Sequence, residues 1–177
     1  MEYQPDNLAY QRAFDKLMAL EGGFVLHEVP GDNGGATYAG ISYRAWPNWE
    51  GWDLLQQHGE NSPVVHEAVR KFYWKEYWDK LKCYAIIKPG PADELFCFGV
   101  VAGKKTAARL AQNVCGAGVD GFIGDETVGM INQMEKDFPT AFETRFKLGQ
   151  VARYAAIVNN DRSQSKFLLG WINRALK

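Results

Sequence analysis

The amino-acid sequence predicts a mainly α-helical protein with a small β-hairpin lobe. Apolar residues recur at spacings of three and four over most of the chain, which is the spacing of a buried helix face. One stretch differs, because the turn sequence Asp32-Asn33-Gly34-Gly35 is flanked by residues 24–26 and 37–41, a pattern typical of a hairpin or an irregular β lobe. A chain of 177 residues is long enough for one domain with a good hydrophobic core and too short for two comfortable ones.

The first predicted helix extends from about residue 6 to residue 20, with Asp6 or Asn7 as its cap. Its apolar residues at helical spacing are Tyr10, Phe14, Leu17 and Met18. One further step of that spacing leads to Glu21. A carboxylate there is desolvated and faces the partial negative charge of the helix end, and both effects favour its protonated form. Gly22 and Gly23 then permit the left-handed conformation that ends a helix, and they let a polymer approach the backbone.

Glu21 therefore has two interpretations. A glutamic acid that keeps its proton near neutral pH can protonate the leaving oxygen in glycoside cleavage. The alternative is an ordinary surface glutamate that turns outward before a glycine stop. The hairpin would bring Asp32 and Thr37 toward the helix end, where a carboxylate can stabilise positive charge and a hydroxyl can hold water. Their structural alternatives are a turn residue and an ordinary strand residue.

The next segments are rich in aromatic residues. Residues 43–52 predict a short helix or two turns, and their tryptophans are Trp46, Trp49 and Trp52. Tryptophans beside a glycan cleft can stack on sugar rings, but they fill small cores as readily. Ser62 and Pro63 open a helix that is predicted to extend to about residue 82. Tyr73 or Tyr77 can edge the cleft, although a core role is the commoner one for such residues.

Helices also fill the second half of the predicted chain. After Pro89-Gly90-Pro91, residues 92–115 form a mostly apolar helix that is interrupted near Gly103. Three further helices are predicted over residues 125–134, 139–158 and 163–176.

Several motifs resemble those of glycoside hydrolase family 108. Glu21-Gly22-Gly23-Phe24 followed by Asp32-Asn33-Gly34-Gly35-Ala36-Thr37-Tyr38-Ala39-Gly40-Ile41-Ser42 closely resembles the family's EGGY…DxGGxTxxGIS signature. Residues 72–78 look like its aromatic helix, residues 119–127 like the VDGxxGxxT motif of its peptidoglycan-binding region, and residues 167–174 like its closing RGWxNR helix. Members of this family are N-acetylmuramidases, found among phage endolysins and bacterial proteins called secretion activators.

The resemblance implies a lysozyme-like arrangement with a cleft between hairpin and helical body. It implies hydrolysis of the β-1,4 bond between N-acetylmuramic acid and N-acetylglucosamine, with Glu21 as general acid, Asp32 as second carboxylate and Thr37 as water holder. The residues that we expect to contact the substrate are Gly22, Gly23, Gly35, Tyr38, Trp46, Tyr73 and Tyr77. A muramidase core over residues 1–88 and a helical, peptidoglycan-binding-like region over residues 89–177 are expected to form one globular unit.

One segment departs from the family pattern. Members carry a sequence like FDxAVNxG where this chain has Cys97 and Val101 in place of the polar pair. This change motivates an alternative function, a peptidoglycan-binding or secretion-accessory module that cleaves poorly. A wall peptidase or amidase is a further alternative, and it would need a metal or a nucleophilic cysteine. The three histidines show no metal-site spacing and the three cysteines are widely spaced, so buried thiols, no metal and no cofactor are expected.

Charge and hydropathy limit the classes of partner and the cellular compartments that we expect for this protein. A net charge of -1 argues against nucleic acid and acidic membranes, and it favours peptidoglycan glycan strands bound by shape and stacking. No apolar run is long enough to span a bilayer, and residues 1–6 lack the features of a secretory signal. We therefore expect synthesis in the cytoplasm and action in the periplasm or cell wall, with access through a holin, a specialised export apparatus or lysis.

Overall fold

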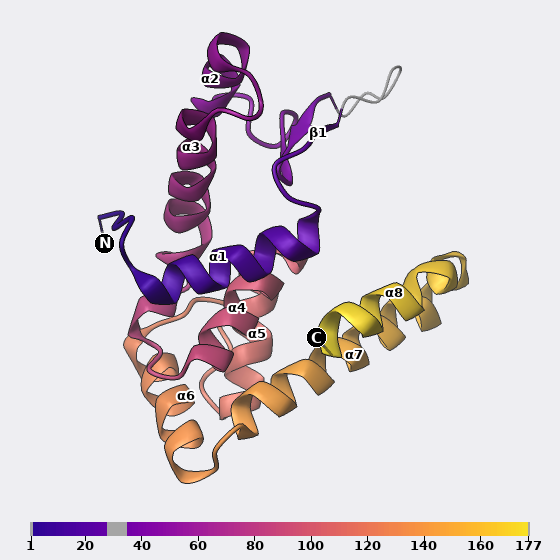
Figure 1. The fold of residues 1–177 in the computed structure, drawn as a ribbon. Helices are drawn as coiled ribbons and strands as arrows, with labels where there is room; N and C mark the ends of the chain where they lie inside the picture. Colours follow the sequence, from indigo (N-terminus) through magenta and orange to yellow (C-terminus); the bar gives the residue numbers. More distant parts are fainter. Residues whose placement is uncertain (1, 28–34, 177) are drawn as a thin grey trace. The chain divides into compact units, whose positions relative to one another are not determined.

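The computed structural model describes residues 2–27 and 35–176, and Figure 1 traces them from indigo to yellow. Within these residues it contains eight α-helices and one three-stranded antiparallel sheet, so the predicted mainly α-helical fold class with a small β lobe is confirmed. The chain divides into two compact units, residues 1–76 and 77–177. The functional division at residues 88 and 89 stays a prediction.

The first unit contains three helices and the small sheet. Its elements are α1 (Leu8–Glu21), β1 (Leu26–His27), β2 (Thr37–Tyr38), β3 (Ile41–Ser42), α2 (Gly51–His58) and α3 (Pro63–Tyr73). The strands pair in the order β1-β2-β3, with Leu26 opposite Tyr38 and Thr37 opposite Ser42. The hairpin expected after the first helix is therefore one part of a three-stranded lobe.

Helix α1 begins and ends where its sequence signals indicate. The Asn7 side chain accepts a hydrogen bond from the backbone N–H of Tyr10 at 2.9 Å, which caps the first turn. At the other end Gly22 has a φ of 88°, in the left-handed region. The buried residues of α1 are Tyr10, Ala13, Phe14, Leu17 and Met18. Tyr10 donates its hydroxyl to the carbonyl of Arg70 at 2.6 Å, so α1 is fixed to α3.

The small sheet is held by contacts with residues outside it. The Tyr38 hydroxyl donates to the carbonyl of Glu60 at 2.5 Å, and the Glu60 carboxylate accepts the backbone N–H of Leu26 at 3.2 Å. The Phe24 ring stacks on His66, with the ring centroids 3.8 Å apart. Strands of two residues bury too little surface to be stable alone, so these contacts to the loop before α3 and to α3 itself position the lobe.

The helix that opens at Pro63 is shorter than predicted. Regular α geometry ends at Tyr73, and the chain continues as a π-helical segment, η1 (Trp74–Trp78), rather than as an α-helix to residue 82. Lys82 has a φ of 48°, in the left-handed region, which a right-handed α-helix does not accommodate. A short 3₁₀ segment, η2 (Cys83–Ala85), follows. Runs of bulky aromatic residues do not distinguish α from π geometry, so the sequence held no signal for this change.

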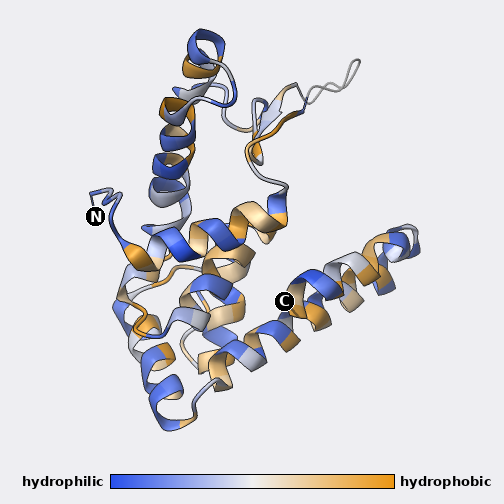
Figure 2. Ribbon diagram, viewed as in Figure 1, coloured by the Kyte–Doolittle hydropathy of each residue, from blue (hydrophilic) through white to orange (hydrophobic). Residues whose placement is uncertain are grey.

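The second unit is helical throughout. Its helices are α4 (Pro89–Ala102), α5 (Lys104–Cys115), α6 (Asp125–Asp137), α7 (Ala141–Asn160) and α8 (Ser165–Leu176), with a 3₁₀ turn η3 (Arg162–Gln164) before α8. Gly103 separates α4 from α5 with a φ of 87°, so the predicted interruption is confirmed. Helices α7 and α8 lie side by side in opposite directions (Figure 1). Figure 2 shows hydrophobic and hydrophilic residues mixed along both.

A buried carboxylate holds the start of α7. Glu135 on α6 accepts the backbone N–H groups of Thr140, Phe142 and Glu143, at 2.9, 2.8 and 3.2 Å. The first N–H groups of a helix have no partner within the helix, so Glu135 acts as their cap from another element. This contact connects α6 to α7.

Glu135→Ala is expected to lower the free energy of unfolding by about 3 kcal/mol, because three N–H groups lose a charged acceptor. Urea unfolding followed by circular dichroism measures this loss. Glu135→Gln keeps one acceptor oxygen and should lose less. Equal stability of Glu135→Ala and the parent would contradict the assigned role.

Candidate active site

Glu21 is the last residue of α1 and is half-buried. The two residues after it, Gly22 and Gly23, have φ values of 88° and 85°, and the N–H of Gly23 donates to the carbonyl of Met18 at 2.9 Å. Apart from the chain neighbours, no atom of the described residues lies within 4 Å of the position that a Cβ would take at either glycine. The chain therefore turns sharply after Glu21 and leaves open space beside its backbone, as an approaching polymer requires.

Gly40 brings the turn of the β2–β3 hairpin against Glu21. A Cβ at Gly40 would lie 3.5 Å from the Oε2 of Glu21 and 2.7 Å from the hydroxyl oxygen of Tyr73. Gly40 also has a φ of 80°, which side chains rarely adopt. Only glycine fits this position without displacing one of the two groups. The hairpin that carries Thr37 is thus brought to the helix end that carries Glu21, as the sequence predicts.

Tyr73 and Tyr38 are buried and hydrogen-bonded to the backbone, and their expected role as substrate contacts stays a prediction. Tyr73 is 1% exposed, and its hydroxyl donates to the carbonyl of Ala39 at 2.8 Å. Tyr38 is fully buried and donates to Glu60. Burial, and then the charge of Glu60, raises the pKa of Tyr38 to about 12, so its hydroxyl remains a donor. Both tyrosines hold the lobe in place.

The remaining catalytic candidates differ in what the structure shows. Thr37 is half-buried and lies between His27 of β1 and Ser42 of β3. Because side chains alternate along a strand, it lies on the opposite face of the sheet from Tyr38. Asp32 lies outside the described residues, so its place as second carboxylate stays a prediction. Gly35 has a φ of 70° at the entry to β2, which fits its expected place in a turn.

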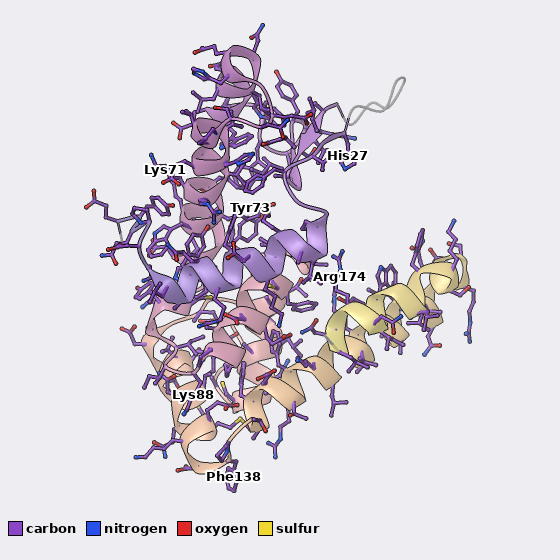
Figure 3. The ribbon with its side chains drawn as sticks, viewed as in Figure 1. His27, Lys71, Tyr73, Lys88, Phe138 and Arg174 are labelled. Atoms are coloured by element: carbon purple, nitrogen blue, oxygen red, sulfur yellow. The ribbon has the colours of Figure 1, made fainter. Side chains whose placement is uncertain are left out.

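Trp46 lines a pocket elsewhere on the first unit. This pocket, of about 390 Å³, is also bordered by Trp49, Phe72, Lys71 and Lys75. Lys71 and Lys75 are each two positions from Tyr73, and two residues of a helix lie about 200° apart. Figure 3 accordingly shows Lys71 and Tyr73 on opposite sides of α3. Trp46 thus borders a pocket together with Lys71, on the side of α3 opposite Tyr73, and its contact with substrate stays a prediction.

Tyr77, the remaining substrate candidate, belongs to the second unit. Its ring lies under the Nζ of Lys104, which is 4.7 Å from the ring centroid. Its contact with substrate stays a prediction.

The cysteines of the second unit have the character of core residues. Cys83 and Cys97 are buried and Cys115 is half-buried. Burial raises the pKa of the Cys83 and Cys115 thiols, and a raised pKa disfavours the nucleophilic thiolate. Val101, the other departure from the family pattern, is 39% exposed at the end of α4. Among the described residues, no three His, Cys, Asp or Glu side chains are grouped as metal ligands would be.

Comparison with known proteins identifies the family. Residues 14–103 match the model of Glycosyl hydrolase 108, and residues 106–176 match that of a predicted peptidoglycan domain. The chain belongs to the glycosyl hydrolase 108 family. It is a lysozyme-type glycoside hydrolase with peptidoglycan as its partner. No curated protein matches it.

A solved structure shows that the fold is shared. SagA of Brucella abortus is 23% identical to this family member, over 94% of this chain and 88% of that one, with a TM-score of 0.67. The described part of the chain has no helix with the length and apolar character of a membrane span.

Three supporting residues were not among the predicted site residues. Gly40 makes the close approach to Glu21 and Tyr73, while Glu60 and His66 hold β1 and the segment before it. Gly40 lies within the family signature, and its glycine next to a strand is a signal of close backbone approach. Glu60 and His66 had no such signal, because single polar residues in a loop or on a helix do not reveal long-range partners.

Gly40→Ala is expected to destabilise the protein by about 3 kcal/mol, because the methyl group adds backbone strain and displaces the Tyr73 hydroxyl. The matched control is Gly59→Ala, since Gly59 has a φ of 78° and no atom within 4 Å of a Cβ. We expect about 1 kcal/mol for the control, from strain alone. Thermal unfolding and hydrolase activity of both variants would measure the difference. Equal losses of stability in the two variants would show that the close approach of Tyr73 to Gly40 does not contribute to the cost of the Gly40 substitution.

Proposed function

We propose that the chain is an N-acetylmuramidase that hydrolyses the β-1,4 bond between N-acetylmuramic acid and N-acetylglucosamine, with Glu21 as general acid. The observation that carries this proposal is the convergence of the Glu21 carboxylate and the Gly40 turn at the open end of α1. Membership of a glycoside hydrolase family supports it. The proposed place of action is the periplasm or cell wall.

The chemistry requires a proton donor on one side of the scissile bond. Glu21 donates its proton to the leaving oxygen as the sugar develops oxocarbenium character. Asp32 is proposed to stabilise that positive charge or to orient water, and Thr37 to hold the water in line. The open backbone at Gly22 and Gly23 leaves room for the glycan next to the acid. The hydroxyl of Tyr73 acts indirectly, because it holds the Ala39 carbonyl and so fixes the turn beside Glu21.

One observation keeps a second function in view. The polar pair typical of the family is replaced by the buried Cys97 and by Val101, which is partly exposed. A chain that binds peptidoglycan but cleaves it poorly would sediment with purified sacculi without release of reducing sugar. Mass spectrometry of digested sacculi separates the two functions, because only a muramidase yields products with reducing N-acetylmuramic ends.

Glu21→Gln is expected to reduce the release of reducing ends by at least about a hundredfold, because the amide cannot donate the proton. Folding and sedimentation with sacculi should be unchanged. Glu50→Gln is the matched control, since Glu50 is an exposed carboxylate of the same unit that borders the Trp46 pocket. It should keep parental activity. Full activity of Glu21→Gln would reject Glu21 as the acid, and loss of activity in Glu50→Gln alone would move the chemistry to that pocket.

A further inference from the structure

The second unit contains a groove that the proposed chemistry does not use. Its volume is about 640 Å³, and its walls are the end of α4 and the facing sides of α7 and α8. The charged and aromatic side chains that line it are Arg153, Tyr154, Lys166, Phe167, Trp171 and Arg174. Every one of these residues lies within the segment that matches the predicted peptidoglycan domain. A groove of this size can hold a ligand of several residues.

The rings of Phe167 and Trp171 form an apolar wall, and the buried ring of Tyr154 packs behind them. The ring centroids of Tyr154 and Trp171 lie 5.4 Å apart, and those of Trp171 and Phe167 lie 5.8 Å apart. Phe167 is exposed despite its size. Rings held against one another in this way present a flat, preorganised surface for small apolar groups such as methyls.

The charged residues that border the groove are all cationic. Arg153, Lys166 and Arg174 contribute its charge, and no acidic residue borders it among the described residues. Residues 141–176 contain six Lys or Arg and only two Asp or Glu, whereas the whole chain has a net charge of -1. Within the described residues, neither Arg153 nor Lys166 forms an ion pair. Positive charge is therefore concentrated on this helix pair and its groove.

Two of the cations lie near one hydroxyl. Burial raises the pKa of Tyr154, while the charges of Arg174 and then Arg153 act in the opposite direction. Glu94 is the acid that acts on the same hydroxyl, but it is buried and paired with Lys147 at 3.6 Å. The groove thus offers positive charge and hydrogen-bond donors beside an apolar wall. Figure 3 labels Arg174 on α8.

Gly170 is a glycine inside α8 at the edge of the groove. Among the described residues, no atom of another part of the chain lies within 4 Å of a Cβ built at this position. A glycine inside a helix costs about 1 kcal/mol relative to alanine. Packing within the described chain does not require a glycine here.

We propose that this groove binds the stem peptides of peptidoglycan, through their carboxylates and their alanine methyl groups. The inference rests on the proposed function, in which peptidoglycan is the substrate. The glycan strand is uncharged where its muramic carboxyls carry peptides, so the anionic part of the polymer is the peptide. Its carboxylates match the guanidinium and ammonium groups, and its methyl groups match the aromatic wall. The second unit then holds the polymer while the first cleaves it.

The test uses the full chain with Glu21→Gln, so that binding is measured without cleavage. The probe is the isolated stem tetrapeptide with free carboxylates, measured by calorimetry and by chemical-shift changes of the Trp171 indole. We expect binding that weakens as salt is raised. Arg174→Gln should weaken it about tenfold, through loss of a charge-assisted hydrogen bond. Gly170→Trp should abolish it by filling the groove.

The control for the last variant is Gly129→Trp. Gly129 is also a glycine inside a helix, with nothing within 4 Å of a Cβ, and it does not border this groove. It should leave tetrapeptide binding unchanged. Circular dichroism of both Trp variants confirms folding, and Gly170→Ala, which adds only one methyl group, should reduce binding without abolishing it.

Several results would overturn the proposal. Equal binding of the carboxyl-amidated tetrapeptide would remove the charge complementarity. Unchanged tetrapeptide binding by Gly170→Trp would place the site elsewhere. Glycan strands stripped of their peptides give a further test. If they bind the parent chain and binding is lost in Gly170→Trp, the groove is a glycan site. Sedimentation that shows dimers of the parent and monomers of Gly170→Trp would make it an interface between copies of this chain.

The experiments distinguish a wrong groove proposal from a wrong assignment of the general acid. Release of reducing ends by the parent chain, together with absence of tetrapeptide binding, rejects only the groove. Tetrapeptide binding together with full activity of Glu21→Gln rejects only the acid.

Discussion

The candidate site depends on the close approach of the Tyr73 hydroxyl to the backbone of Gly40. This contact connects three parts of the first unit: the end of α3, the β2–β3 turn and, through the same glycine, the Glu21 carboxylate at the end of α1. A buried hydroxyl requires an acceptor, and the Ala39 carbonyl supplies it. Loss of this contact would leave a buried donor without a partner, so the turn and the tyrosine stabilise each other. The position of the hairpin beside Glu21 follows from this requirement.

The two units are held together by different kinds of contact. In the first unit a lobe with almost no core of its own is held in place by tyrosine hydroxyls and by Glu60. In the second unit helices pack on helices, and the buried Glu135 joins α6 to α7 through backbone N–H groups. The first arrangement suits a site that must admit a polymer. The second gives a rigid support for a groove between helices.

Local signals in the sequence predicted much of this fold. The Asn7 cap, the Gly22 stop and the break at Gly103 depend on backbone preferences that a residue carries with it. The signature around Glu21 and Thr37 likewise indicated that the helix end and the hairpin belong together. These features depend on neighbours in the chain, which is why they can be recognised without the structure.

Features that depend on distant partners could not be predicted in this way. The sequence favoured a core role for Tyr73 and placed Tyr38 at the cleft, but it could not reveal the distant carbonyl groups that accept their hydroxyls. Trp46 borders a pocket together with residues of α3, and the spacing of residues in the sequence does not predict this contact. The cations and rings that line the groove come from both α7 and α8, which a turn separates in the sequence. Each case needs the packing of two elements, which a single segment does not encode.

The attachment of the sheet through so few side chains has a consequence for entry of the polymer. A glycan strand in a wall is cross-linked, so it cannot be threaded end-first through an enclosed tunnel and must enter sideways. A segment anchored by a few hydrogen bonds and one ring stack detaches at a far smaller free-energy cost than the helices beneath it. The contacts of Glu60 and His66 therefore bear on the stability of the small sheet more than on that of the helices of the first unit.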